Sequence, residues 1–264
     1  MIKLAVLGAT GRMGSRTIAM LAGDERFELT AALTQPGDPR VGESVECPGR
    51  SVPIAATTDA PFDVLIDFSL PEGTMAWLDA CVERSAAMVI GSTGHSEAQL
   101  ARIDAAGERI PVLRAANFSL GVNLLSALCA EAAARLGNDW DVEIIEQHHG
   151  QKVDAPSGTA LALANQIAQA RGPGRPTEIV VGRSGHTPAR PAGQIGIHAV
   201  RLGSLVSVHD VHFGSSEETV TLRHAAHSRD VFVRGALETA AWIARRPPGH
   251  YSMADVLSLR KTPS

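Results

Sequence analysis

The chain is poor in cysteine, in aromatic residues and in long apolar runs, and it has no excess of positive charge. Its three cysteines, Cys47, Cys81 and Cys129, are widely spaced and form no Cys-x-x-Cys pair. A disulfide framework and a structural zinc site are therefore not expected. Three isolated thiols fit a cytoplasmic protein, in which thiols stay reduced.

Two classes of protein are excluded by the lack of membrane and basic signatures. No apolar run approaches the ~18 residues that a membrane helix needs, and the first residues run directly into a strand pattern, so no secretory signal is expected. The net charge of −4 argues against a protein that binds nucleic acid through bulk electrostatics. We therefore expect neither a membrane nor a nucleic-acid partner.

What is present is enough apolar sequence for a large core, since 44% of the 264 residues are hydrophobic. In the first ~120 residues short apolar runs alternate with helical spacing, which predicts βαβ units and a doubly wound parallel sheet. The predicted strands cover residues 2–7, 28–33, 64–68, 88–91 and 111–115, and the predicted helices cover 73–85 and 97–109.

The pattern changes after that point, and the second half is expected to be α+β with a mixed or antiparallel sheet. Gly203-Ser204 between two strand-like runs indicates a hairpin. The predicted elements are helices at 122–136, 159–170 and 233–245, strands at 141–147, 196–202, 205–213 and 218–225, and a loop-rich segment at 171–194. The two patterns of predicted strands and helices indicate two domains. One comprises residues 1–118 and 230–264, with the last helix returning to it, and the second comprises residues 119–229.

A glycine-rich turn, G-A-T-G-R-M-G, follows the first strand and opens a helix. Gly8, Gly11 and Gly14 would let the backbone turn tightly and approach a pyrophosphate closely. The helix N-terminus would add free N–H groups and the positive end of a dipole. The turn therefore predicts a dinucleotide site, against the simpler interpretation of a tight turn without a ligand.

The second strand lacks the acid that usually binds the adenosine ribose. Thr34 and Gln35 occupy its end, and the nearest acid, Asp38, follows Pro36 and Gly37. Nothing obvious then repels a 2′-phosphate, which Arg12 or Arg40 could receive. The sequence predicts NADPH or NADH as the cofactor and favours NADPH.

Two further loops follow predicted strands, where a doubly wound sheet places its ligand. They are Gly91-Ser92-Thr93-Gly94-His95 and Ala115-Ala116-Asn117-Phe118-Ser119. Position alone favours a cofactor role for both, although each could be a turn with hydrogen-bonding side chains.

The densest group of chemical side chains is E-Q-H-H-G-Q-K-V-D-A-P-S-G-T, residues 146–159. A bend at Gly150 could bring His148 and Lys152 to one ligand. A histidine exchanges protons near neutral pH, and the helix that starts near Ser157 suits a carboxylate. The segment predicts a pocket for a small dianion with a proton donor or acceptor beside it.

Blander interpretations of this segment also exist. Most histidines are structural, and His148-His149 invites a metal site. No metal is expected, because no third ligand follows at a useful spacing. Asp154 is expected to orient the loop or Lys152 rather than to bind substrate.

These motifs together resemble the 4-hydroxy-tetrahydrodipicolinate reductase family over nearly the whole chain. The E-x-H-H-x-x-K-x-D-A-P-S-G-T block is highly specific, whereas the glycine turn alone is weak. The other matching stretches are residues 67–74 (D-F-S-L-P-E-G-T), 91–94 (G-S-T-G), 115–123 (A-A-N-F-S-L-G-V-N), 182–187 (G-R-S-G-H-T) and the tail around Ser228-Arg229.

The resemblance implies an NAD(P)H-dependent reduction of a cyclic imine dicarboxylate with loss of water, in diaminopimelate and lysine synthesis. His148 and Lys152 would be catalytic, and His149, Gly158 and Thr159 would hold the substrate carboxylates. Residues 119–229 would bind substrate and assemble a homotetramer through their sheet. Residues at the cofactor would be Gly8, Ala9, Thr10, Gly11, Arg12, Met13, Thr34, Gln35, Gly91, Ser92, Thr93, Ala115, Ala116, Asn117 and Phe118.

Other functions remain open from the residues themselves. One is a different two-domain NAD(P) oxidoreductase acting on a sugar or an aldehyde. A cysteine-dependent aldehyde dehydrogenase fits less well, since no cysteine has a credible nucleophile setting. A third is a redox sensor or scaffold that binds NAD(P)H without turnover, which would have little use for the His148/Lys152 pair.

Overall fold

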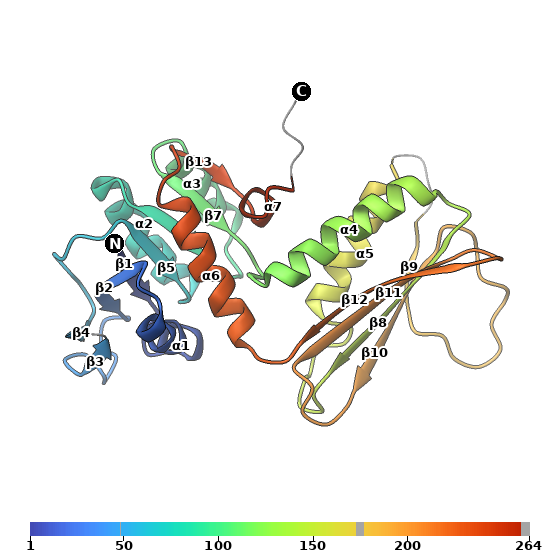
Figure 1. Cartoon of the computed structure of the whole chain (residues 1–264), viewed down its shortest axis with the longest axis horizontal. Coiled ribbons are helices and arrows are strands. Elements are labelled where there is room, and N and C mark those ends of the chain that lie inside the picture. The colour runs from blue at the N-terminus through green and yellow to red at the C-terminus, as the bar shows by residue number, and fades with distance from the viewer. Residues whose placement is uncertain (48, 173–176, 260–264) are drawn as a thin grey trace. The chain divides into compact units, whose positions relative to one another are not determined.

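The computed structural model describes residues 1–47, 49–172 and 177–259. The chain divides into two compact units: unit 1 is Met1–Leu120 with Asp230–Ser264, and unit 2 is Gly121–Arg229 (Figure 1). No helix in the described part of the chain is long and apolar enough to cross a membrane.

Unit 1 has an α/β fold. The strand order of its sheet is β13-β7-β6-β5-β1-β2-β4-β3 in the described residues. The strands pair in parallel except β3, which is antiparallel to β4. The predicted doubly wound parallel sheet is therefore confirmed. Its strands are β1 (Ile2–Leu7), β2 (Phe27–Leu33), β3 (Ser44–Cys47), β4 (Arg50–Ala55), β5 (Val64–Asp67), β6 (Ala87–Ile90), β7 (Pro111–Arg114) and β13 (Gly249–Tyr251).

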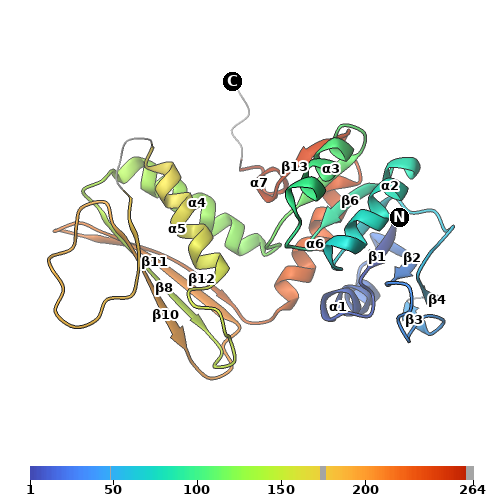
Figure 2. The same cartoon turned by 180° about the vertical axis from the view of Figure 1, so that it is seen from behind.

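Helices cover both faces of this sheet (Figures 1 and 2). Alternate residues of β1 enter two different cores: Leu4 and Val6 pack on the side of α1 and α6, and Ala5 and Leu7 on the side of α2 and α3. Burial on both faces explains why the strand reads as a continuous apolar run. The helical elements are α1 (Arg12–Met20), the 3₁₀ turn η1 (Leu21–Gly23), α2 (Pro71–Arg84), α3 (Glu97–Gly107), α6 (Asp230–Ile243) and α7 (Met253–Val256).

Three strands of unit 1 were not predicted from the sequence. Strand β3 is exposed or half-buried throughout, and β4 contains Pro53, so neither carries the apolar run of a central strand. Strand β13 is only three residues long. All three lie toward the edges of the sheet, where burial imposes little pattern on the sequence.

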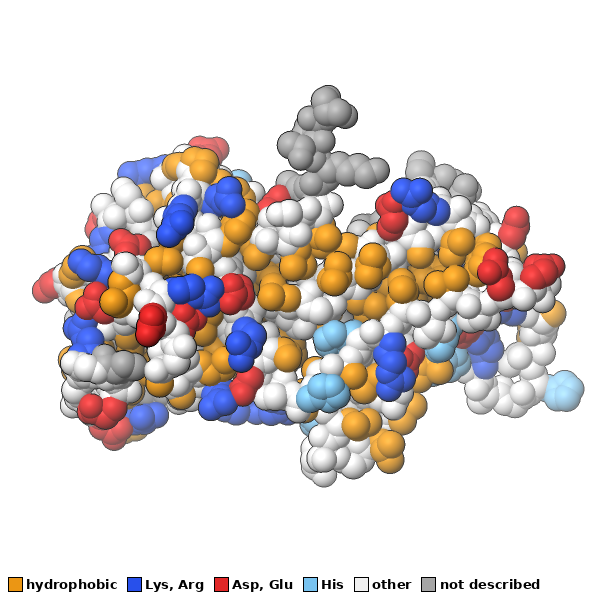
Figure 3. Space-filling view, viewed as in Figure 1, with side chains coloured by type: hydrophobic (Ala, Val, Ile, Leu, Met, Phe, Trp, Pro, Cys, Tyr) orange, Lys and Arg blue, Asp and Glu red, His pale blue; other side chains and the backbone are white. Residues whose placement is uncertain are grey.

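Unit 2 is a five-stranded sheet in the described residues, in the order β12-β11-β8-β10-β9, packed against two helices. The outer side of α4 leaves Leu124 and Leu128 exposed, and Figure 3 shows hydrophobic side chains gathered along it. The elements are α4 (Leu120–Leu136), β8 (Asp141–His148), α5 (Gly158–Ala170), β9 (Ile179–Val181), β10 (Ile195–Arg201), β11 (Ser207–Gly214) and β12 (Thr219–Ala226). Strand β9 lies within the segment predicted as loop, and residues 173–176 of that segment lie outside the described residues.

The predicted hairpin about Gly203-Ser204 is wrong. Strands β10 and β11 do not pair with each other, because β8 lies between them, parallel to β10 and antiparallel to β11. The connection instead crosses the carboxyl end of β8: Leu202 N donates to His148 O at 2.8 Å, and Gly150 N donates to Gly203 O at 3.1 Å. The crossing ties the loop after β10 to the histidine segment.

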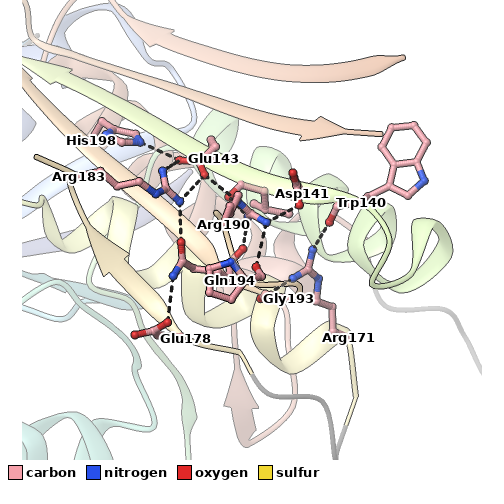
Figure 4. A network of polar contacts seen from close by, with 12 residues as sticks. Trp140, Asp141, Glu143, Arg171, Glu178, Arg183, Arg190, Gly193, Gln194 and His198 are labelled. Carbon is pink, nitrogen blue, oxygen red and sulfur yellow. Dashed lines mark hydrogen bonds and ion pairs between the residues drawn. The ribbon is translucent and has the colours of Figure 1, made fainter. Parts of the chain in front are cut away.

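A network of polar contacts holds the segment after β9 to β8, the middle strand of the unit 2 sheet (Figure 4). Glu143 on β8 accepts hydrogen bonds from Arg183, Arg190 and His198. Burial opposes ionisation of this carboxyl, but these partners lower the pKa of Glu143 to about 2. Gly196 opposite it has no room for a Cβ, which would lie 2.0 Å from a Glu143 carboxylate oxygen.

Candidate active site

Three loops of unit 1 meet at the carboxyl ends of its parallel strands. Strand β1 lies between β2 and β5, so the chain reverses its direction of progress across the sheet there, and ligands of doubly wound sheets bind at such a switch point. A Cβ on Gly8 would lie 2.7 Å from Phe68 O, and one on Gly91 would lie 2.5 Å from the Phe68 ring. Phe68 and Phe118 pack edge to face with centroids 6.1 Å apart. The predicted loops after β1, β6 and β7 therefore all contact Phe68, in the loop after β5.

The glycine turn is tightly packed at Gly8 and Gly14 and exposed at Gly11. Gly8 has φ +82°, and a Cβ on Gly14 would lie 2.1 Å from Gly8 O, so neither position accepts a side chain without displacing the backbone. Gly11 is exposed and N-caps α1 in an extended conformation. Exposed glycine backbone at a helix N-terminus matches the chemistry of a phosphate group.

The remaining residues of the turn differ in exposure. Ala9 is buried, Thr10 is half-buried, and Arg12 is exposed. Met13 packs partly against the core. Thr10, Gly11, Arg12 and Met13 therefore all retain surface that a ligand can reach.

A buried carboxylate supports the loop that follows β6 through hydrogen bonds. Asp67 is fully buried and accepts hydrogen bonds from Ser69 N at 2.8 Å, Thr74 Oγ1 at 2.5 Å and Ser92 Oγ at 3.0 Å. His95 Nε2 lies 3.1 Å from Thr74 Oγ1. Ser92 is therefore a support for the loop, while the next residue, Thr93, is exposed.

The loop after β7 is fixed by helix α6. A Cβ on Gly235 would lie 1.8 Å from Phe118 O, so the helix approaches this loop closely only because it has a glycine there. Asn117 Oδ1 accepts a hydrogen bond from Ser119 N at 2.9 Å. Phe118 is buried, Ala115 is half-buried and Ala116 is exposed.

In unit 2, one face of β8 changes from apolar to polar along its length. Val142 and Ile144 enter the core beneath α4 and α5. Glu146 and His148 follow on the same face and are also buried, at 0% and 8% exposure. A strand alternates its faces with period two, so the apolar pattern itself directs these two side chains inward at the carboxyl end of the strand.

Glu146 is the centre of a cluster of hydrogen bonds. It accepts from His148 Nδ1 at 2.5 Å, from Arg201 at 3.0 Å through each of two nitrogens, and from Ser157 N at 3.0 Å. Burial alone would raise the pKa of Glu146, but the hydrogen bonds from Arg201, His148 and Ser157 outweigh it and hold that pKa below its usual value. Glu146 is therefore an ionised carboxylate that only accepts hydrogen bonds.

This carboxylate sets the tautomer of His148. Because Glu146 only accepts, Nδ1 of His148 must carry a proton, and Nε2 is left to exchange one. Burial lowers the pKa of His148 against the opposing effect of Glu146, so the ring is neutral near pH 7. His209 packs edge to face on it with centroids 5.4 Å apart, and burial lowers the pKa of His209 to about 4.

The predicted bend after His148 is present. Lys152 N donates to His149 O at 3.1 Å, which turns the chain back and places the Lys152 charge close enough to lower the pKa of His148. Lys152 Nζ contacts both oxygens of Asp154, at 2.7 and 2.8 Å, as expected of a residue that orients the lysine. His149 Nε2 lies 3.3 Å from a nitrogen of Arg229.

Helix α5 begins beside this group. Ser157 caps it by accepting from Ala160 N at 3.2 Å, and Ser157 Oγ lies 3.3 Å from His209 Nε2. Gly158 is exposed, and a Cβ there would meet nothing within 4 Å. The first turn of the helix therefore presents open space above its backbone, next to Thr159.

Sequence reasoning missed the residues that support this site. Arg201 joins the Glu146 carboxylate to Asp154 O at 2.6 Å, and nothing in the sequence marks it, since it comes from a different strand. A signal for Glu146 did exist: an acid occupies a core position of an alternating strand, and a buried carboxylate needs partners.

Comparisons with known proteins agree over the whole chain. The sequence models described as "Dihydrodipicolinate reductase, N-terminus" and "Dihydrodipicolinate reductase, C-terminus" match residues 2–118 and 121–257. A 4-hydroxy-tetrahydrodipicolinate reductase of Psychrobacter arcticus is 43% identical, over 98% of this chain and 96% of its own. One of Syntrophotalea carbinolica is 42% identical, over 98% and 100%. The solved structure of a dipicolinate-bound dihydrodipicolinate reductase from Paenisporosarcina sp. TG-14 has a TM-score of 0.78 and 27% identity, covering 97% of this chain and 98% of its own.

Proposed function

Because the chain belongs to the dihydrodipicolinate reductase family, we propose that residues His148 to Thr159 of unit 2 carry its chemistry. The chain is an NAD(P)H-dependent reductase that converts 4-hydroxy-tetrahydrodipicolinate to tetrahydrodipicolinate with loss of water, in diaminopimelate and lysine biosynthesis. The observation that carries the residue assignment is the buried Glu146–His148 pair with Lys152 beside it.

Unit 1 would hold the cofactor on the loops after β1, β6 and β7. The exposed backbone at Gly11 suits the pyrophosphate, and the loops at Gly91–Thr93 and Ala115–Phe118 lie at the same edge of the sheet. Bound NAD(P)H supplies the hydride. Gly8 and Gly14 pack against the protein's own backbone and fix the shape of the turn, so the exposed Gly11 is the glycine left to approach a phosphate.

Unit 2 would hold the two carboxylates of the substrate. The exposed first turn of α5 at Gly158 and Thr159 offers backbone N–H groups at a positive dipole end. Lys152 adds a cation whose present partner, Asp154, is largely exposed. A dianion can replace that partner, and the dipicolinate bound to the Paenisporosarcina relative is a dicarboxylate of this kind.

Loss of water from the substrate needs one group that takes a proton from the ring and one that gives a proton to the leaving hydroxyl. Neutral His148 fits the first role through Nε2, because Glu146 fixes its other nitrogen and stabilises the imidazolium that forms. Lys152 fits the second, since its ammonium donates a proton to the leaving hydroxyl. Once the ring has accepted hydride, the imidazolium of His148 returns the proton that it took, so the ring ends with no added charge.

We also propose a homotetramer assembled through the sheet of unit 2. Helices α4 and α5 cover one face of that sheet, and the opposite face carries Ile145, His198 and Val200 on adjacent strands, with Val200 37% exposed. Light scattering on the purified protein is expected to give four times the chain mass of 27.7 kDa. A monomer at micromolar concentration would contradict this assembly.

The experiment that tests the function is cofactor oxidation, followed by nicotinamide absorbance, with freshly generated 4-hydroxy-tetrahydrodipicolinate. We expect substrate-dependent oxidation of both NADH and NADPH by the native protein. Tight cofactor binding with no oxidation would instead identify a sensor, and oxidation with sugars or simple aldehydes alone would identify a different oxidoreductase.

A further inference from the structure

The acid that follows strand β2 in the sequence, Asp38, is folded back to the end of that strand. Residues Gln35-Pro36-Gly37-Asp38 form a turn in which Asp38 N donates to Gln35 O at 3.2 Å. Gly37 has φ +84°, which is the third position of a type II turn, and Pro36 suits the second. The turn folds the chain back, so an acid four residues beyond Thr34 returns to the end of the strand.

The returned carboxylate lies against the glycine turn. Asp38 Oδ2 accepts hydrogen bonds from Thr10 Oγ1 and from Thr34 Oγ1, each at 2.7 Å. The two hydroxyl oxygens lie 3.0 Å apart. Thr10 stands where the second glycine of a G-x-G-x-x-G motif would be, and Thr34 is the residue directly after β2. Asp38 therefore lies between the two elements that flank an adenosine ribose in a doubly wound sheet.

The carboxylate is charged and retains capacity for a ligand. Hydrogen bonds from Thr34, from the Arg40 amide and from Thr10 lower the pKa of Asp38, so it is ionised at neutral pH. A carboxylate has about four acceptor sites, and partners in the described residues occupy three: two on Oδ2 and the Arg40 amide on Oδ1 at 2.9 Å. The fourth, on Oδ1, can accept from a ribose hydroxyl.

The charge of the nearby Arg40 contributes to lowering the pKa of Asp38, but Arg40 is already paired with a second carboxylate. The Arg40 side chain is directed to Glu43, at 3.0 Å from Nε. Arg12 is exposed on the first turn of α1, and no contact holds it near Asp38 in the part of the chain that the structure describes. A 2′-phosphate placed against Asp38 would face a fixed negative charge, whereas a 2′-hydroxyl would donate a hydrogen bond to it.

We propose that Asp38 is the specificity-determining residue for the reductant, accepting a hydrogen bond from an adenosine ribose hydroxyl and making the protein prefer NADH to NADPH. This inference rests on the nucleotide binding assigned above to unit 1. It reverses the preference for NADPH that the absence of an acid at Thr34 and Gln35 had suggested.

The test is the binding of adenosine fragments by calorimetry, which needs neither substrate nor hydride transfer. The probes are 5′-AMP and adenosine 2′,5′-bisphosphate, with NADH and NADPH measured alongside them. For the native protein we expect at least ~10-fold tighter binding of 5′-AMP and of NADH than of their 2′-phosphorylated counterparts, in the range of one hydrogen bond to a charged group.

Asp38→Asn is expected to reduce that ratio at least ~10-fold, chiefly by improving the binding of the phosphorylated probes. Asp38→Ser is a second variant in case the amide disturbs the turn, and thermal unfolding of both variants checks that the fold is retained. Glu25→Gln is the matched control, since it removes an equal charge from an exposed position just before β2, at the opposite end of that strand from Asp38, and it should leave the ratio unchanged.

Two results would overturn the proposal: native protein that binds the 2′-phosphorylated probes as tightly as the others, or folded Asp38 variants whose ratio equals that of the native protein. Because the fragments carry no nicotinamide, these results are independent of the reductase assay. A protein with the expected ratio but no turnover would refute the catalytic assignment and leave the role of Asp38 intact.

Discussion

Lys152→Ala and His148→Ala are each expected to lower kcat by at least ~10²-fold, the range of a general acid or base. Lys152 supplies the proton for the leaving hydroxyl and, before that transfer, a positive charge that attracts the dianion, and alanine supplies neither. The His148→Ala variant lacks both Nε2 and the contact that Nδ1 makes with Glu146. The measurement is steady-state cofactor oxidation with saturating reductant, and unfolding curves should show that both variants remain folded.

The matched control for the lysine is Val153→Ala. Val153 is adjacent in sequence and 98% exposed, so its truncation should leave kcat within about twofold of the native value, as a surface change does. Loss of activity in Val153→Ala would mean that the loop tolerates no change at all. Near-native turnover in both Lys152→Ala and His148→Ala would remove the catalytic assignment.

Glu146→Ala is expected to destabilise the protein by about 3–5 kcal/mol. The fully buried carboxylate is the shared partner of Arg201, His148 and Ser157 N. Its removal leaves a largely buried guanidinium without a counter-charge. Denaturant unfolding of the variant against native protein measures the loss, and Arg102→Ala is a control, since its ion pair with Asp79 is exposed and should contribute less than about 1 kcal/mol.

Glu146→Gln separates positioning from folding, because glutamine keeps the shape and removes the charge. We expect kcat to fall at least ~10-fold, by analogy with the loss of an orienting carboxylate. Glu146 raises the pKa of His148 against the effect of burial, so without it that pKa falls further. Neutral His148 then persists to lower pH, and the acid limb of the kcat profile should move to lower pH. A profile that is lower but unshifted would mean that Glu146 has only a structural role.

The fold was predictable from sequence where burial acts on every residue. Strand β1 is covered on both faces, and its continuous apolar run indicates a strand buried within a parallel sheet. The error at Gly203-Ser204 has a different origin, since a local turn signal cannot report that β8 is inserted between β10 and β11. Pairing of strands distant in sequence depends on the packing of the whole sheet, which no short motif encodes.

The same distinction separates the parts of the site that were predicted from those that were not. His148 and Lys152 belong to one segment, so spacing alone could place them together. Arg201 comes from a neighbouring strand and reaches Glu146 only when the sheet has formed. Asp38 reaches Thr10 and Thr34 because the turn before it reverses the direction of the chain. The proline and glycine of Gln35-Pro36-Gly37-Asp38 are enough to predict a turn. They do not indicate that the turn brings the Asp38 carboxylate against Thr10.

The most direct measurement for the central claim is a crystal structure of the protein with dipicolinate. The account predicts that one carboxylate lies on the backbone N–H groups of Gly158 and Thr159, with Lys152 Nζ turned from Asp154 to the ligand and His148 Nε2 facing the ring. Dipicolinate bound elsewhere, with Lys152 still paired to Asp154 and the imidazole directed away from it, would contradict the account.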